Sequence, residues 1–237
     1  MSIPVIDIRN VSKSFEIHDV GRRITACRGV NITVHSGEFV GITGKSGSGK
    51  STILKLIYRS YLPQEGEIFY HSKAYGLINL FSSSERQIIN LRRYEIGYVS
   101  QFLHVIPRTS ARSIVEKAAL EMGADQVSAS EKAEHLLTHF ELAQELWDSY
   151  PSTFSGGEKL RLNIARAMIK EPRLLLLDEP TASLDSHSKR KVWELISQLK
   201  DKGTTMLGIF HDLEFMGELC DREHHMSAGI MEPINEN

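Results

Sequence analysis

The chain has 237 residues, of which 41% are hydrophobic, enough for one sizeable core or for a core with a small additional lobe. The formal net charge of −2 provides no basic excess for binding the phosphate backbone, so nucleic acid is not an expected partner. The two cysteines, Cys27 and Cys220, stand far apart and form no C-x-x-C motif, which fits a reducing compartment.

The ends and the apolar stretches of the chain bear on its location. Residues 1–7 lack a charged segment followed by an apolar run, so no signal peptide is predicted. The longest strongly apolar stretch, Leu174 to Leu177, is far too short to span a bilayer. We therefore expect a soluble cytoplasmic protein, whose role at a membrane would need a separate partner.

Two strands are expected at the start of the chain, over residues 5–17 and 24–34. Phe15 stands near the end of the first. An aromatic side chain here could stack on an adenine ring, because every base offers a π-face, or it could pack in the core. The residue alone leaves both interpretations open.

A glycine-rich stretch follows an expected strand over residues 38–43 and precedes an expected helix over residues 53–58. It matches the phosphate-binding motif G-x-x-x-x-G-K-[ST], in which the glycines let backbone N–H groups point inward at phosphate oxygens. Lys50 is expected to reach the β- and γ-phosphates, and Ser51 to offer its hydroxyl to Mg²⁺. A plain turn would not need this context of strand and helix. The motif consists of Gly44, Lys45, Ser46, Gly47, Ser48, Gly49, Lys50, Ser51 and Thr52.

The next segment alternates between strand and helix patterns. A turn at residues 62–66 leads to a strand over 67–70, a helix over 84–93 and a buried strand over 96–100. That last strand ends at Gln101. An amide at a strand end beside a phosphate loop is well placed to meet Mg²⁺ or the attacking water, although a single Gln there is unremarkable.

The composition changes between residues 110 and 140, where Glu, Lys, Ala and Leu replace β-branched stretches. Ser128 and Glu131 have the spacing of a capping box and predict the start of a helix. We therefore predict an inserted helical lobe.

A second glycine pair occurs in Ser155-Gly156-Gly157-Glu158, which leads into a helix expected to end near residue 169. Ser155 and Glu158 have capping-box spacing and could merely start that helix. The two glycines could instead expose N–H groups at the helix N-terminus and form a second anion site. Both interpretations stay open.

The apolar strand predicted over residues 174–177 ends in two carboxylates, Asp178 and Glu179. In open α/β sheets, ligands bind at the carboxyl ends of parallel strands. Asp178 could help to hold Mg²⁺, and Glu179 could act as a general base, whereas the simpler alternative is a solvated strand end. A loop over 180–185 and a helix over 186–200 are expected next.

A further strand is predicted over residues 205–210 and ends at His211. This histidine could contact a γ-phosphate, although a lone histidine is more often structural. Because few residues follow His211 in this sequence, we expect no regulatory domain after it.

Taken in order, these motifs resemble the nucleotide-binding domain of the ABC ATPases over nearly the whole chain. The resemblance implies ATP and Mg²⁺ as cofactors, and ATP hydrolysis as the activity. Its motifs are the P-loop, the adenine-stacking aromatic Phe15, the Q-loop Gln101, the signature Ser155-Gly156-Gly157-Glu158, the Walker B pair Asp178-Glu179, the D-loop Asp185 and the switch histidine His211.

The resemblance also implies a fold and a site. The fold is an α/β P-loop NTPase with a parallel central sheet, an N-terminal antiparallel β region and an inserted helical lobe. One domain would cover residues 1–237, with its core in 1–101 and 160–237 and the lobe over about 102–159. The implied catalytic residues are Glu179, His211, Gln101 and Lys50, and the implied Mg²⁺ ligands are Ser51, Gln101 and Asp178.

Several positions depart from the pattern of common transporter ATPases, namely Phe154, Glu158, Asn163 and the segment 208–212, which lacks the usual Thr before His211. They are similar to the PhnL family, the ABC-type subunits of the carbon–phosphorus lyase system. This narrower resemblance implies a role in phosphonate breakdown, around the synthesis of ribose 1-phosphonate 5-triphosphate. It also implies a soluble lyase core and a sister ABC subunit as partners.

The family likeness implies that two chains pack head to tail, each ATP lying between one P-loop and the other chain's signature. The dimer would be a homodimer or a heterodimer with the sister subunit.

The main alternative to the lyase role is the motor of a membrane transporter, with a membrane partner on the helical lobe. A clamp on nucleic acid is disfavoured by the charge and the lack of a heptad run. A pseudo-ATPase is disfavoured because Lys50, Ser51, Asp178 and Glu179 are all present.

Overall fold

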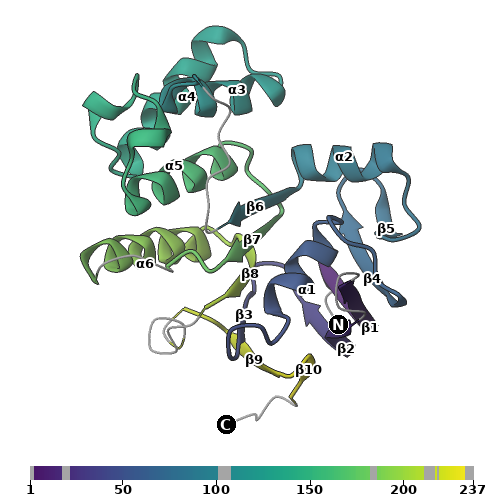
Figure 1. Ribbon diagram of the computed structural model, residues 1–237. Coiled ribbons are helices and arrows are strands. Elements are labelled where there is room, and N and C mark those ends of the chain that lie inside the picture. Colours follow the sequence, from purple (N-terminus) through teal and green to yellow (C-terminus); the bar gives the residue numbers. More distant parts are fainter. Residues whose placement is uncertain are drawn as a thin grey trace.

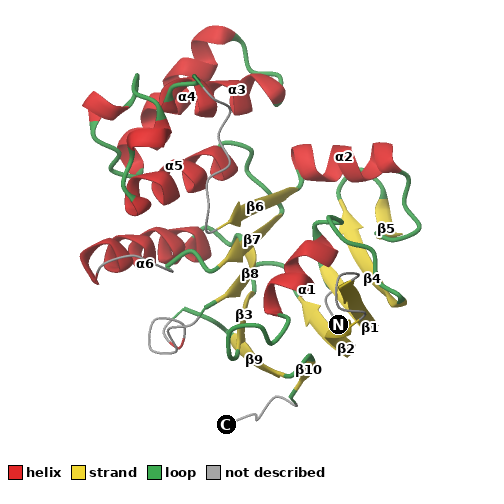
Figure 2. Ribbon diagram, viewed as in Figure 1, coloured by secondary structure: helices red, strands yellow, loops and turns green. Residues whose placement is uncertain are grey.

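A computed structural model of the chain describes residues 3–17, 22–100, 108–181, 186–210, 217 and 219–232. Within these ranges the chain forms two β-sheets and a group of helices, with the N-terminus beside the smaller sheet (Figure 1). Figure 2 shows helices α3 to α6 on one side of the larger sheet and helices α1 and α2 on the other, with the smaller sheet lying beyond α1.

The smaller sheet is antiparallel and contains four strands in the order β2-β1-β4-β5. This confirms the predicted N-terminal antiparallel β region. Strand β5 was not predicted, because its four residues are exposed or half-buried and carry little periodic signal. The bounds are β1 Ile6–Ile17, β2 Arg22–Val34, β4 Glu65–Ser72 and β5 Gly76–Asn79.

The larger sheet has the strand order β10-β9-β3-β8-β7-β6. Its strands are parallel except for β10, which pairs antiparallel with β9. The predicted parallel central sheet is therefore confirmed, while the two C-terminal strands were missed. The bounds are β3 Phe39–Thr43, β6 Ile96–Ser100, β7 Leu174–Asp178, β8 Thr205–Ile209, β9 Arg222–Ser227 and β10 Ile230–Met231.

Strand β7 lies between two apolar clusters, and its side chains alternate between them as a pleated strand requires. Leu175 and Leu177 face a cluster that also contains residues of helices α3 to α6. Leu174 and Leu176 face the opposite cluster, shared with helix α1 and the antiparallel sheet. Burial on both faces explains the continuous apolar run in this strand.

The register of the parallel strands brings the chemically important ends together. Ser100 pairs with Asp178, and Asp178 pairs with Ile209. Strand β3 runs in the same direction beside β8 and ends at Thr43, immediately before the P-loop. The P-loop and the acidic pair therefore emerge from the same edge of the sheet, as expected for an open α/β fold.

Helices α3, α4 and α5 form a group beyond strand β6, on the far side from the antiparallel sheet (Figure 1). The residues at which this group is divided from the core, about 102 and 159, stay a prediction. None of the helices that the structure describes combines the length and hydrophobicity needed to cross a bilayer. The helix bounds are α1 Lys50–Ile57, α2 Glu85–Tyr94, α3 Ala111–Glu121, α4 Gln126–His139, α5 Gly156–Met168 and α6 Ser186–Asp201; two short 3-10 helices cover Gln144–Leu146 and Pro151–Thr153.

The predicted start of helix α4 at Ser128 was wrong. The helix begins at Gln126, and its N-cap is Asp125, whose carboxylate accepts hydrogen bonds from the N–H groups of Val127 and Ser128, both at 3.0 Å. Ser128 lies in the first turn and its hydroxyl donates to the same carboxylate at 2.8 Å. An aspartate is as good an N-cap as a serine, so spacing alone chose the wrong residue.

A buried carboxylate joins the two sheets. Glu95, 5% exposed, stands between helix α2 and strand β6. It accepts hydrogen bonds from the hydroxyls of Ser72 at 2.7 Å and Tyr70 at 3.2 Å, and from the N–H groups of Lys73 at 2.9 Å and Ala74 at 3.2 Å. Burial and the neighbouring Glu95 charge raise the pKa of Tyr70, so its hydroxyl stays protonated as a donor.

We predict that Glu95→Ala lowers the free energy of unfolding by about 3 kcal/mol, because four buried or half-buried donors lose their acceptor. Glu95→Gln is expected to lower the free energy of unfolding by less, since its amide retains one acceptor oxygen. Urea unfolding followed by circular dichroism measures the change, with exposed Glu67→Ala as the control expected to stay within about 0.5 kcal/mol. Equal effects of Glu95→Ala and Glu67→Ala would contradict this account.

Candidate nucleotide-binding site

The P-loop approaches neighbouring strands so closely that only glycine fits at two positions. Gly44 has φ +135° and Gly49 has φ +106°, conformations that side chains rarely adopt. A Cβ on Gly44 would stand 2.1 Å from the carbonyl oxygen of Met226, and one on Gly49 would stand 1.8 Å from that of Ala26. Gly44 and Gly49 are therefore required by packing against β9 and β2 as well as by the backbone conformation.

The C-terminal hairpin holds the loop from outside. The N–H of Gly229, in the turn between β9 and β10, donates to the carbonyl of Ser48 at 3.0 Å. The carbonyl of Gly229 in turn accepts from the N–H of Arg28 at 2.8 Å. This support was not predicted, because the two short strands β9 and β10 carry little sequence signal of their own.

Lys50 lies inside the loop and is only 3% exposed. Its ammonium group donates to the carbonyl oxygens of Gly44 at 2.7 Å and Lys45 at 2.9 Å. Burial lowers the pKa of Lys50, and the charges of Glu179 and Asp178 oppose that shift. An ammonium group has three N–H donors, so two bonds to the loop leave one for an anion.

Ser48 supplies a second sign that the loop fits an anion. Its hydroxyl is buried and has no hydrogen-bond partner among the residues that the structure describes. A buried hydroxyl without a partner is costly, and a phosphate oxygen would accept its hydrogen bond. Together with Lys50 and the backbone N–H groups of a helix N-terminus, the loop has the donor set that a polyphosphate needs.

The carboxylate of Asp178 accepts two hydrogen bonds from different elements. The hydroxyl of Ser51, at the start of α1, donates to Oδ1 at 2.8 Å, and the hydroxyl of Tyr98, on β6, donates to Oδ2 at 2.6 Å. A hydroxyl and a carboxylate in contact are hard oxygen donors of the kind that Mg²⁺ prefers. The residues therefore fit a magnesium ion beside the P-loop.

Tyr98 was not recognised from the sequence, where it is one aromatic residue in a short buried strand. Its ring packs against that of Tyr58 with 5.0 Å between the centroids. Burial, followed by the hydrogen bond to Asp178, raises the pKa of Tyr98. The phenol therefore stays protonated at neutral pH and can only donate to the carboxylate. The sequence carried no signal for this role, because the pairing of β6 with β7 that brings Tyr98 beside Asp178 is a property of the fold.

Glu179 directly follows strand β7 in an uncommon backbone conformation, with φ +52°. Its N–H donates to the carbonyl of Ile209 at 3.2 Å, which holds the turn against strand β8. Positive φ in a residue other than glycine is uncommon and carries strain, and strained residues cluster at active sites and switch regions. Because Glu179 also affects the pKa of Lys50, both predicted acids lie at the P-loop edge.

The Ser155 motif forms a complete capping box at the start of helix α5. The hydroxyl of Ser155 accepts from the N–H of Glu158 at 3.3 Å, and the carboxylate of Glu158 accepts from the N–H of Ser155 at 2.7 Å. Ser155 and Gly156 are nevertheless exposed, so the cap leaves this helix end open to a ligand. Figure 1 shows α5 and α1 in different parts of the molecule.

The remaining predicted site residues are only partly described. Phe15 lies on β1, half-buried, with its ring edge-to-face to Tyr61 at 5.1 Å and the ammonium of Lys13 5.2 Å from the ring centroid. Its adenine-stacking role stays a prediction. Gln101, Asp185 and His211 lie outside the described residues, as does the rest of 101–107, 182–185 and 211–216.

The P-loop and the acidic end of β7 lie on one edge of the sheet, and a second open helix N-terminus lies in a separate helical group. This arrangement defines an ATP-binding cassette. Comparison with protein families agrees, since the model for the ABC transporter family matches residues 27–182. The chain belongs to this family. It is accordingly an ATPase that uses ATP with Mg²⁺.

Relatives and solved structures extend this result. The chain is 34% identical over 232 residues to the lipoprotein-releasing system ATP-binding protein LolD of Saccharophagus degradans, covering 98% of each chain. It is 35% identical over 212 residues to the macrolide export ATP-binding/permease protein MacB of Wolinella succinogenes, covering 90% of this chain but 32% of MacB. The dimeric ATP-binding cassette MJ0796, bound to ADP and phosphate, superposes with a TM-score of 0.87 at 30% identity, covering 96% of this chain and 97% of the other.

These relatives are named for release and export systems. The general resemblance to the ABC ATPases is therefore confirmed. The narrower resemblance to the PhnL family and to the carbon–phosphorus lyase system finds no support among them.

We predict that Tyr98→Phe raises the Mg²⁺ concentration for half-maximal ATP hydrolysis roughly tenfold, because Asp178 loses the donor that orients its second oxygen. Direct Mn²⁺ binding, followed by electron paramagnetic resonance in the presence of ADP, is expected to weaken in parallel. Tyr94→Phe, on the exposed part of α2, is the matched control. Unchanged metal dependence in Tyr98→Phe would show that this hydrogen bond does not position Asp178.

Proposed function

We propose that the chain is the nucleotide-binding subunit of a membrane transport system, acting on the cytoplasmic side of the membrane beside a membrane-spanning partner. The observation that supports this proposal best is its likeness to LolD over 98% of both chains. MacB supports the same conclusion through its ATP-binding part, since the chain spans about a third of that protein, 32% of its length.

We assign the site residues from the geometry of the P-loop, Asp178 and Glu179, and from the family motifs for Phe15, Gln101 and His211. The P-loop, from Gly44 to Thr52, holds the phosphates, and Phe15 stacks on the adenine. Ser51 and Asp178 hold Mg²⁺ together with Gln101. Glu179 is the general base, and His211 contacts the γ-phosphate. The contact between Ser51 and Asp178 supports the metal assignment, and the positive φ of Glu179 is typical of a functional position.

In the proposed hydrolysis, the free N–H of Lys50 donates to the γ-phosphate while its other two hold the loop carbonyls. When bound, Mg²⁺ neutralises charge on the phosphoryl group as it is transferred. Glu179 accepts a proton from the attacking water and must lie within one hydrogen bond of it. Positioning and electrostatic stabilisation supply most of the acceleration in this type of reaction.

A second copy completes the site in this proposal. Ser155 and Gly156 are exposed at the start of α5, while the P-loop precedes α1 in another part of the same chain. The cassette MJ0796 is described as a dimer with ADP and phosphate. We infer a head-to-tail dimer in which each ATP lies between one P-loop and the partner's signature, with Asp185 near the contact. Either two identical chains or a sister subunit could form it.

We predict that Glu179→Gln retains ATP binding, hydrolyses ATP at least about 100-fold more slowly and accumulates as a dimer. Without the base, the γ-phosphate persists and keeps the two copies joined. Light scattering after size-exclusion chromatography measures the dimer, and exposed Glu145→Gln serves as the control. If the variant stays monomeric in saturating Mg-ATP and hydrolyses it normally, the scheme is wrong.

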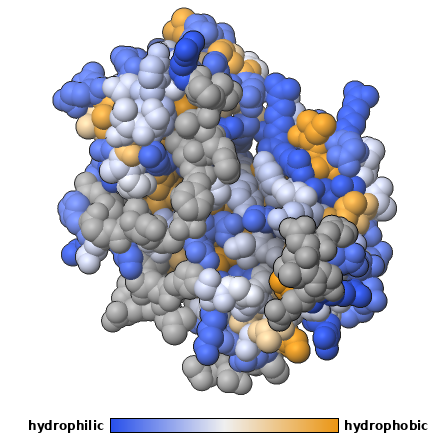
Figure 3. Space-filling view, in the orientation of Figure 1, coloured by the Kyte–Doolittle hydropathy of each residue, from blue (hydrophilic) through white to orange (hydrophobic). Residues whose placement is uncertain are grey.

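The membrane partner needs a docking surface, and the junction of helices α2 and α3 has suitable chemistry. Arg93 donates from Nε and a terminal nitrogen to the carbonyl of Glu121, at 3.1 and 2.7 Å, which fixes the two helices together. Ile89, 61% exposed, lines a groove of about 440 Å³ there, and an apolar patch stands over α2 (Figure 3). Exposed apolar anchors framed by arginine are typical of interfaces. The groove is also lined by Arg92, Arg93, Glu121 and Lys170.

A role in phosphonate breakdown is the second candidate, with a soluble lyase core and a sister ABC subunit as partners. It rests on Phe154, Glu158 and Asn163, the departures from the common transporter pattern. Each has a local structural reason: Phe154 is buried, Glu158 completes the cap of α5, and the amide of Asn163 donates to the carbonyl of Ser100 at 3.2 Å. These reasons hold whatever the substrate, so we rank this candidate below transport.

Co-purification separates the two candidates. We predict that an affinity-tagged chain, extracted in mild detergent from cells grown with or without phosphate starvation, recovers a multi-spanning membrane protein. Ile89→Glu is expected to reduce that recovery at least fivefold, whereas Val127→Glu, an exposed position on α4, is the control. Recovery of soluble phosphonate enzymes without a membrane protein would favour the second candidate.

A further inference from the structure

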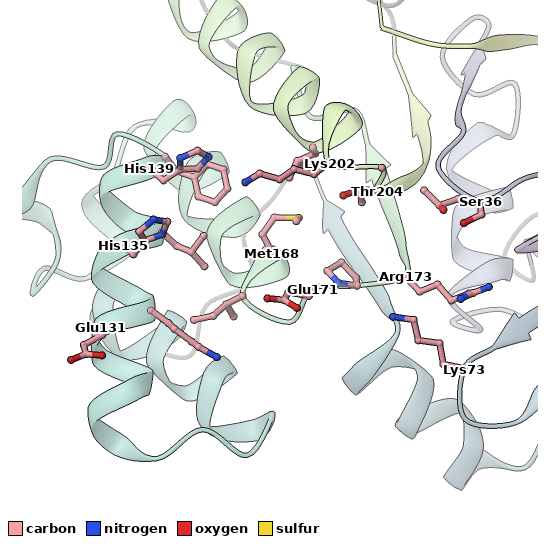
Figure 4. A pocket seen from close by; sticks show the side chains of 18 residues that line it. Ser36, Lys73, Glu131, His135, His139, Met168, Glu171, Arg173, Lys202 and Thr204 are labelled. Atoms are coloured by element: carbon pink, nitrogen blue, oxygen red, sulfur yellow. The ribbon is translucent and has the colours of Figure 1, made fainter.

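A cavity of about 830 Å³ opens at the opposite edge of the parallel sheet from the P-loop. Helix α4, the segment between α5 and β7, and the segment from α6 into β8 form its walls (Figure 4). Residues next to the amino ends of β7 and β8 line it, whereas the P-loop and Asp178 stand at carboxyl ends. Five-residue strands separate the two edges by about 16 Å, so this cavity is distinct from the nucleotide site.

The size and the apolar wall of the cavity suit a small organic molecule. Its volume falls in the range of about 300–1,000 Å³ that is usual for small-molecule sites. Figure 4 shows Met168 projecting into the space between α4 and the end of α6. An apolar body placed here would lose its contact with water on several sides. The apolar wall consists of Leu136, Phe140, Met168, Ile169, Pro172 and Leu199.

The polar lining carries an excess of positive charge. The cations are Lys73, Lys132, Arg173 and Lys202, and the acids are Glu131 and Glu171.

Among the described residues, none of the four cations has a side-chain hydrogen bond or an ion pair, and the Nε of Arg173 is buried without a partner. Figure 4 shows the amino group of Lys202 reaching towards His139. Burial and then the positive charge of Lys202 lower the pKa of His139, which favours its neutral form, so this histidine adds no further positive charge.

We propose that this cavity binds a soluble amphipathic anion, a carboxylate or phosphate monoester on an aliphatic body. The anionic group lies between Lys202 and Lys132, and the aliphatic body packs on Met168 and Phe140. Cations without ion pairs beside an apolar wall favour this class over neutral apolar molecules, which would make no charge-assisted hydrogen bond to the exposed Lys132 and Lys202. They also favour it over inorganic anions, which would leave the wall uncovered.

Such a ligand would touch both parts of the molecule. Lys132 belongs to α4, in the same helical group as the signature, whereas Lys202 follows α6, which packs on the sheet that carries the P-loop. A bound anion would therefore hold the helical group in one orientation against the sheet. Binding itself does not depend on the proposed transport function, and it can be tested without hydrolysis.

The experiment is a calorimetric titration of the full chain with decyl phosphate, in saturating ADP and Mg²⁺ so that the nucleotide site is filled. One molecule is expected to bind per chain. Lys202→Gln is expected to weaken binding roughly tenfold, and Glu171→Gln to strengthen it several-fold, a gain that misfolding does not produce. Lys117→Gln, an exposed lysine on α3 outside the cavity, is the matched control.

Several results would overturn the proposal. No binding of decyl phosphate, equal binding of decanol, or equal losses in Lys202→Gln and Lys117→Gln would each do so. A sedimentation arm with phosphatidylglycerol vesicles distinguishes a membrane surface from a soluble ligand. Binding to vesicles without binding to decyl phosphate would place the cations in membrane contact and refute the cavity site.

Discussion

The carboxylate of Asp178 is the point at which the central elements meet. It accepts from Ser51 at the start of α1 and from Tyr98 on β6, while its own backbone belongs to β7. These contacts require the parallel register that places the strand ends level with one another. A shift of one residue in that register would turn Asp178 to the other face of the sheet and separate it from both donors.

The phosphate loop is built around the same edge by close backbone packing. Gly49 lies against Ala26 of β2, and Gly44 lies against Met226 of β9, so strands from both ends of the chain shape one loop. Glu179 keeps a strained conformation because β7 and β8 hold the residues around it. Strain of this kind persists only where the surrounding structure determines the backbone firmly.

The residues of the proposed ATP site lie in two separate parts of the molecule. The P-loop and the acidic pair belong to the sheet edge, whereas Ser155 begins a helix in the group beyond β6. An ATPase divided in this way can respond to the orientation of one part against the other. The cavity at the amino ends of β7 and β8 is lined by residues of both parts. A ligand in the proposed cavity site would therefore act on the nucleotide site, at the opposite edge of the sheet, through the orientation of the two parts.

The sequence alone determined the features that depend on local pattern: the P-loop, the parallel strands and the acidic strand end. Tertiary structure decided the rest. Tyr98 became a partner of Asp178 only through strand pairing, and β9 was recognisable only beside β3. Helix α4 begins at Gln126 because Asp125, and not Ser128, caps it. Motif spacing reports what a residue can do, whereas packing between distant segments decides which partner it meets.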